Sequence, residues 1–136
     1  MIPYRYVLAW LGLLVIAVAN GALREATYAK VMSELAAHQL STLTCAVAFA
    51  AAIRIMVRRW PPASSREAMA IGVAWLLLTV AFEFFMGLVL AGRPLTELLA
   101  AYDVAAGRVW VFLLIWIALA PLIFHRIQAR RARREN

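Results

Sequence analysis

The chain has 136 residues, of which 65% are hydrophobic and 15% charged, and its mean hydropathy is +0.81. A soluble domain has about 45–50% apolar and about 25% charged residues, so the composition indicates a single-domain membrane protein. The formal net charge of +7 does not indicate nucleic-acid binding, because the basic residues flank apolar segments and no aromatic residues alternate with them.

Four stretches are long and apolar enough to cross a bilayer, which takes about 20 residues with a range of about 17–25. They cover approximately residues 6–23, 40–57, 68–91 and 109–124. The first has features of a signal peptide, with Arg5 before an apolar run and small residues after it, but we expect it to be retained as a span. The second holds Cys45, the single cysteine, which excludes an internal disulfide and is expected to be a packing residue. The sequence therefore predicts an all-α, four-helix transmembrane domain over residues 1–136.

The basic residues are divided unevenly between the two sides of these spans. Ten adjoin the start of the first span, the second connection or the end of the fourth span: Arg5, Arg54, Arg58, Arg59, Arg66, Arg126, Arg130, Arg131, Arg133 and Arg134. The other two connections carry four: Arg24, Lys30, Arg93 and Arg108. An excess of Lys and Arg marks the cytoplasmic side, so both termini are predicted to be cytoplasmic. The connections at residues 24–39 and 92–108 are then predicted to face outward, and the basic tail at about residues 125–136 to contact anionic lipid.

Local signals predict how the spans begin and end. In the cytoplasmic connection, two prolines end the second helix, and Ser64 or Ser65 can cap the third. Ser41 is a candidate cap for the second helix. Each outward connection is rich in helix-forming residues and is expected to form a short amphipathic helix. Four aromatic residues are expected at the membrane interfaces: Tyr4, Tyr6, Trp60 and Trp110.

Glu83 is an acidic residue within the third apolar stretch. A carboxylate near the bilayer centre costs roughly 2.5–3.5 kcal/mol on insertion scales, so it normally has a partner or a function. Glu83 shares a helix face with Gly72, Thr79 and Gly87, whose small side chains permit close helix approach, so this face is expected to point into the bundle. An arginine at the interface can extend its side chain inward. We therefore expect Arg24 or Arg108, and then Arg93, to pair with Glu83: Glu83 is expected in the outer half of the membrane, where these arginines are.

Other polar residues cluster near the same outer end, which predicts an outward-facing polar pocket with Glu83 at its floor. The ten candidate binding residues are polar or charged: Asn20, Arg24, Glu25, Tyr28, His38, Gln39, Glu83, Tyr102, Asp103 and Arg108. Structural roles remain open alternatives. Glu83 can form a buried ion pair that fixes packing or can face lipid, His38 can be an interfacial residue, and Asp103 can cap a short helix.

The sequence contains no specific catalytic or metal-binding motif, and no cofactor is expected. His38 and His125 lie near opposite sides of the membrane, so they cannot both ligate one haem. Three functions remain open: binding or transport of a small polar or anionic molecule, a structural role as an accessory subunit of a larger membrane complex, and an intramembrane enzyme acting on a lipid-linked or periplasmic substrate. Transport would favour a homo-oligomer, because four helices leave little room for an aqueous path. Nucleic acid is not an expected partner.

Five segments carry a resemblance: "NGALRE", "AHQLSTLT", "TVAFEF", "AGRPLTELLAAYDVAAGRVW" and the following "LAP". With these, most of the chain resembles a group of small four-span bacterial inner-membrane proteins of uncharacterised function. The resemblance implies the four-span architecture and an inner-membrane location, and it implies no activity. It draws attention to Arg24, Glu25, His38, Glu83 and Arg108. The relatives read nearer Asp-Tyr-Asn where this chain has Ala101-Tyr102-Asp103, so the resemblance assigns Asp103 no fixed role.

Overall fold

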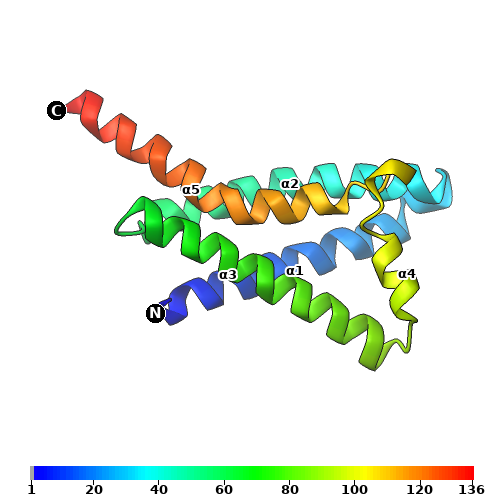
Figure 1. The fold of residues 1–136 in the computed structure, drawn as a ribbon. Coiled ribbons are helices and arrows are strands. Elements are labelled where there is room, and N and C mark those ends of the chain that lie inside the picture. Colours follow the sequence, from blue (N-terminus) through cyan, green and yellow to red (C-terminus); the bar gives the residue numbers. More distant parts are fainter. Residues whose placement is uncertain (1) are drawn as a thin grey trace.

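The computed structural model describes residues 2–136, which form four long helices and four short helical segments. The long helices are α1 (Tyr4–Ala26), α2 (Glu34–Arg59), α3 (Ser65–Phe84) and α5 (Trp110–Glu135) (Figure 1). The short segments are η1 (Tyr28–Lys30), the π-helix η2 (Phe85–Leu90), α4 (Leu95–Ala100) and η3 (Val104–Ala106). Since η2 continues α3, four helices of 23 to 26 residues are long and apolar enough to span a membrane. The predicted all-helical fold is confirmed, as are four helices that are long and apolar enough to span a membrane.

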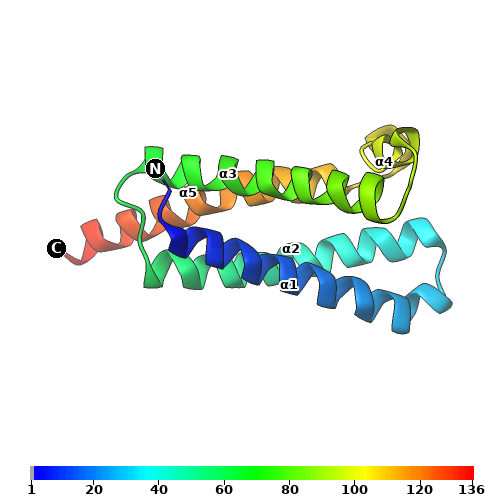
Figure 2. The same cartoon turned by 90° about the horizontal axis from the view of Figure 1, so that it is seen from below.

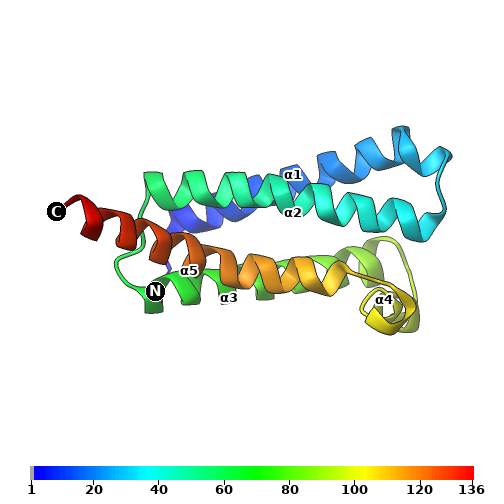
Figure 3. The same ribbon diagram turned by 90° about the horizontal axis from the view of Figure 1, so that it is seen from above.

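The four long helices are arranged in two layers, with α1 beside α2 and α3 beside α5 (Figures 2 and 3). Both chain ends and the α2–α3 loop lie at one end of the bundle, which we call the terminal end (Figure 1). The α1–α2 connection and α4 lie at the other, which we call the capped end. The segments that carry the ten basic residues therefore share the terminal end. α5 continues beyond the bundle there, so the basic tail is helical.

α2 begins earlier than the sequence analysis expected. The hydroxyl of Ser33 accepts a hydrogen bond from the backbone N–H of Ala36 at 3.2 Å, which caps the helix before Glu34. Ser41, the expected cap, is instead a buried residue within α2. The α1–α2 connection therefore contains the three-residue η1 and no separate amphipathic helix, and that expectation was wrong because residues 34–39 continue α2. The connection between α3 and α5 contains α4.

The start of α3 follows the expected capping chemistry. The hydroxyl of Ser64 accepts a hydrogen bond from the N–H of Glu67 at 3.1 Å. The Glu67 carboxylate in turn accepts one from the N–H of Ala63. These two reciprocal bonds resemble a capping box, and the first of them satisfies an N–H group that the first turn of a helix leaves free.

The tightest contacts lie toward the terminal end. At Gly72 an added Cβ would lie 1.9 Å from the backbone oxygen of Ala118, so the backbones of α3 and α5 touch there. The indole N–H of Trp75 donates to the carbonyl of Tyr6 at 2.8 Å, which ties α3 to α1. Tyr6 is fully buried within the bundle, and its hydroxyl donates to the Trp60 carbonyl at 3.2 Å. The buried phenol has this carbonyl as its partner.

Packing loosens toward the capped end. The buried residues of α1 and α3 lie in the parts nearer the terminal end: Tyr6, Leu13, Ala68, Ile71, Gly72 and Trp75. In Figure 1, α1 and α3 cross and then diverge, and α4 spans the distance between the end of α3 and the start of α5. In α1 and α3, the parts nearer the capped end are therefore less buried than the parts nearer the terminal end.

Candidate functional site

A cavity of about 680 Å³ lies at the capped end, within the range of about 300–1,000 Å³ that is usual for small-molecule sites. Its polar and charged lining residues come from all four long helices and the connection between α3 and α5: Asn20, Arg24, Glu34, His38, Gln39, Ser41, Thr42, Glu83, Arg93, Glu97, Tyr102, Arg108 and Trp110. Seven of the ten candidate residues are among them: Asn20, Arg24, His38, Gln39, Glu83, Tyr102 and Arg108. The other three, Glu25, Tyr28 and Asp103, do not line the cavity.

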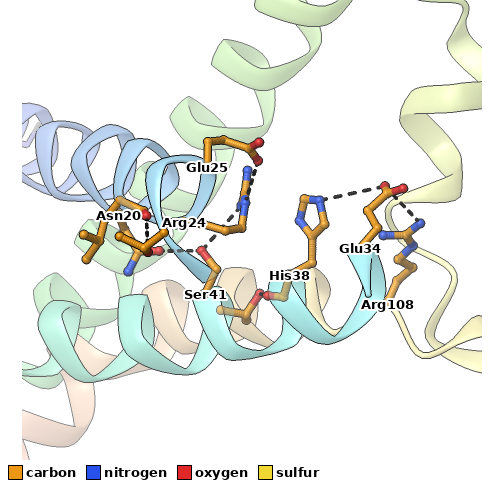
Figure 4. A network of polar contacts seen from close by, with 10 residues as sticks. Asn20, Arg24, Glu25, Glu34, His38, Ser41 and Arg108 are labelled. Carbon is orange, nitrogen blue, oxygen red and sulfur yellow. Dashed lines mark hydrogen bonds and ion pairs between the residues drawn. The ribbon is translucent and has the colours of Figure 1, made fainter. Parts of the chain in front are cut away.

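One wall of the cavity is a polar contact between α1 and α2 (Figure 4). Arg24 donates from Nε to the Glu25 carboxylate at 3.0 Å and from Nη1 to the Ser41 hydroxyl at 3.4 Å. The side-chain amide of Asn20 is hydrogen-bonded to the hydroxyls of Ser41 and Thr44. Ser41 is only 6% exposed. The network therefore fixes the Arg24 guanidinium at the edge of the cavity, with part of its fork of donors unused.

Glu34, His38 and Arg108 form a second polar group beside it (Figure 4). The Glu34 carboxylate lies 3.8 Å from Nη2 of Arg108 and 4.0 Å from Nε2 of His38. His38 is close enough to both Arg24 and Arg108 to be influenced by their charges. Because the Glu34 side chain is 79% exposed, its ion pairs contribute little, about 0–1 kcal/mol. Arg108 can therefore exchange this partner for a ligand at small cost.

Glu34 and Ser41 were missed as pocket residues in the sequence. Both lie on the same face of α2 as His38 and Cys45, at helical spacings of three and four residues. The signal that could have found them is the Ser33 cap, because a helix starting there places Glu34 on this face. Cys45 is buried in the core, as expected, and also touches the cavity.

The partner of Glu83 differs from the expected arginine. Its carboxylate accepts a hydrogen bond from the hydroxyl of Tyr102 at 2.9 Å. Within residues 2–136, the ion pairs within 4.0 Å do not include Glu83. Each of the three arginines pairs with another acidic residue: Arg24 with Glu25, Arg108 with Glu34 and Arg93 with Glu97. The predicted Glu83–arginine pair was wrong, because each arginine has a carboxylate nearby and Tyr102 already occupies the position beside Glu83.

Tyr102 belongs to residues 92–108, which we call the cap. Its ring stacks on Phe84 of α3, with centroids 6.2 Å apart and an interplanar angle of 23°. Burial, followed by the influence of Glu83, raises the pKa of Tyr102 above its ordinary value. The hydroxyl therefore stays protonated near neutral pH and can donate to Glu83.

Further contacts hold the cap at both ends. The side chain of Leu98 fills the space beside Gly87, where an added Cβ would come within 2.4 Å of it. The amide of Gln39 donates to the Gly107 carbonyl at 2.8 Å. Gly92 and Gly107 have positive φ values of 62° and 87°, which glycine adopts without strain. The cap is thus a defined element with a glycine at each end.

Asp103 acts within the cap rather than in the cavity. Its carboxylate accepts a hydrogen bond from the N–H of Ala106 at 3.2 Å and caps η3. This is the structural alternative that its position left open.

A second, smaller cavity of about 190 Å³ adjoins the first. Its lining is almost entirely apolar: Trp10, Leu13, Leu14, Ala17, Val18, Phe49, Thr79, Phe82, Glu83, Trp110 and Ile117. Four of these residues also line the larger cavity: Ala17, Phe82, Glu83 and Trp110. Glu83 therefore lies where a polar pocket meets an apolar one.

Among residues 2–136, no three His, Cys, Asp or Glu side chains are placed to hold a metal ion. Comparisons with protein families, with curated proteins and with solved structures gave no match, so the site is interpreted from its own chemistry.

Proposed function

We propose that this chain is a bacterial inner-membrane protein, with both termini in the cytoplasm, whose outward-facing pocket binds a small polar or anionic molecule for transport. The uneven distribution of Lys and Arg supports the orientation, since the ten basic residues belong to segments at the terminal end. The volume and polar lining of the 680 Å³ cavity support binding.

The observation that carries the proposal is the convergence of Arg24, His38 and Arg108 on one wall of the pocket. A guanidinium group presents a planar fork of N–H donors that matches a carboxylate or phosphate. The side chains of Arg24 and Arg108 are 21% and 35% exposed, so both are reachable from the pocket and partly shielded from water. A group with oxyanion character is the ligand chemistry this wall suits.

Ligand-induced stabilisation of the protein in lipid nanodiscs tests the proposal. The panel would contain acetate, inorganic phosphate, glycerol phosphate and a zwitterionic amino acid. A ligand at 100-fold its Kd raises the free energy of unfolding by about 2.7 kcal/mol. We expect at least one solute to stabilise the wild-type protein, and Arg24→Gln to remove that effect.

Arg54→Gln is the matched control, because Arg54 is an exposed arginine of α2 away from the cavity. It should respond to the solute as the wild type does. Equal loss of response in Arg24→Gln and Arg54→Gln would show that the solute acts through general charge. A panel in which no solute stabilises the protein would contradict binding of a small water-soluble molecule.

One observation favours a second candidate, an accessory subunit of a larger membrane complex. The three arginines of the pocket already have acidic partners, so the polar cluster can serve to fix the fold. Glu83→Gln separates the two functions, since a glutamine oxygen can still accept the Tyr102 hydrogen bond. A binding protein should keep its fold and change its ligand affinity, whereas an accessory subunit should co-purify with a defined partner and show no ligand response. Transport also favours a homo-oligomer, which particle mass in nanodiscs would reveal.

A further inference from the structure

The apolar cavity continues directly from the polar pocket. Ala17, Phe82 and Trp110 border both, with Glu83 at the junction. A small, fully polar solute would occupy the larger cavity, but it has no apolar part to fill the smaller one. The pair of cavities instead matches a molecule with one polar end and one apolar end.

The apolar cavity also has a side that faces out of the bundle. Val18 lines the cavity and is 63% exposed, and Leu14 beside it is only partly buried. α1 and α3 cross and then diverge toward the capped end (Figure 1). In a membrane this side lies against lipid chains, so an aliphatic chain can enter between α1 and α3 without crossing water.

The polar end of such a molecule would lie against Arg24 and Arg108. These residues border only the larger cavity, on the wall formed by α1, α2 and the end of the cap. Glu83 lies at the junction of the two cavities rather than beside these arginines, and its carboxylate accepts a hydrogen bond from the Tyr102 hydroxyl of the cap.

We infer that the ligand is a single-chain amphiphile, with a carboxylate or phosphate head in the polar pocket and the part of its aliphatic chain nearest the head in the apolar cavity between α1 and α3. This inference rests on the proposed function and names the class of molecule that the same pocket takes. The junction formed by Ala17, Phe82 and Trp110 admits the chain.

Brominated stearate in phosphatidylcholine nanodiscs provides a direct probe. Bromine quenches indole fluorescence on contact, and Trp10 and Trp110 both line the apolar cavity. We expect a saturable component of quenching above the linear background from stearate dissolved in the bilayer, with its amount expressed per mole of membrane-bound fatty acid. Trp110→Phe should reduce this component. Arg24→Gln should weaken the binding about tenfold, as expected for loss of a charge-assisted hydrogen bond.

Ala17→Phe should abolish the saturable component, because the added ring occupies the junction of the two cavities. Ala19→Phe is its matched control: Ala19 is exposed on α1 and borders neither cavity. If Ala17→Phe fails to fold, saturated fatty acids of decreasing length decide the question on the wild-type protein. Occupancy at equal membrane concentration should fall once the chain is too short to fill the apolar cavity. Brominated lysophosphatidylglycerol, compared with brominated stearate, distinguishes a phosphate from a carboxylate head.

Two results would overturn the inference in distinguishable ways. If acetate or phosphate binds as tightly as stearate, the pocket takes a soluble oxyanion, and the proposed function stands without the amphiphile. If quenching stays linear in every variant while the solute panel also fails to stabilise the protein, both proposals are wrong.

Discussion

The hydroxyl of Tyr102 gives the Glu83 carboxylate a donor from the cap rather than from an arginine. The bond joins two segments 19 residues apart in the chain, and the stacking of Tyr102 on Phe84 holds the ring in place. A buried acceptor without its donor costs about 1–3 kcal/mol. Glu83 therefore contributes to holding the cap over the pocket.

Tyr102→Phe removes this donor and keeps the ring. We expect the free energy of unfolding to fall by about 1–3 kcal/mol, and amide hydrogen exchange in residues 95–106 to accelerate. Tyr4→Phe is the control, because Tyr4 is 79% exposed and its hydroxyl makes no hydrogen bond among residues 2–136. Unchanged exchange in Tyr102→Phe would mean that other contacts alone hold the cap.

The raised pKa of Tyr102 predicts how this contribution depends on pH. The unfolded phenol has a pKa of about 10, and the folded value lies above it because of burial and then Glu83. The stabilisation is therefore fully present below about pH 10 and is lost as the pH rises through the folded pKa. We expect the difference in unfolding free energy between wild type and Tyr102→Phe to stay constant up to about pH 10. Above that pH it should shrink, as the pH rises through the folded pKa of Tyr102. If this free-energy difference disappears well below pH 10, the effect belongs to a titrating group other than Tyr102.

The contact of α3 with α5 depends on the missing side chain of Gly72. An added Cβ would lie 1.9 Å from the carbonyl oxygen of Ala118, a backbone atom that cannot turn away. The two helices would have to separate, and overpacking of this kind costs about 1–3 kcal/mol.

Gly72→Ala should therefore lower the unfolding temperature and the yield of folded protein in mild detergent. Gly12→Ala on α1 is the matched control, since a Cβ there meets nothing within 4 Å. Alanine is a better helix former than glycine by about 1 kcal/mol, so the control should be neutral or stabilised. Equal destabilisation of both variants would contradict the close-contact explanation.

The elements show why some of the fold could be predicted from the sequence and some could not. Hydropathy predicted all four spans, because a run of about 20 apolar residues is rarely anything else. Hydropathy placed the start of α2 too late, because residues 34–39 include polar residues and do not belong to the apolar run. They are nevertheless part of α2, since Ser33 is its N-cap. The widened turn of η2 had no sequence signal; there Gly87 accommodates Leu98 from α4, a contact that exists only after the chain has folded back.

The molecule as a whole divides its basic residues between two ends, and this division predicts its orientation. Seven of the ten candidate residues reached one cavity because their backbones lie at the same end of their helices. The pairings of these residues could not be predicted, because they depend on the path of the cap. The cap places Tyr102 beside Glu83, while Arg24 and Arg108 pair with Glu25 and Glu34.

Cysteine labelling in spheroplasts tests the orientation. In a Cys45→Ala background, Thr96→Cys in α4 should react with a membrane-impermeant maleimide. Ala129→Cys in the basic tail should react only after the membrane is permeabilised. Both positions are exposed, so differences in burial do not explain a difference in labelling. The opposite labelling pattern would mean that the orientation is the reverse of the predicted one. Equal labelling of both cysteines would indicate insertion in two orientations.

The cap joins the rest of the molecule through two glycines with positive φ, Gly92 and Gly107. These joints let the segment between them change length or sequence without bending the helices on either side. The roof of the pocket can therefore differ while the four long helices stay the same, provided that Leu98 and Tyr102 keep their contacts with Gly87 and Glu83. Exchange of this one cassette would alter what the pocket admits while leaving the four spans as they are.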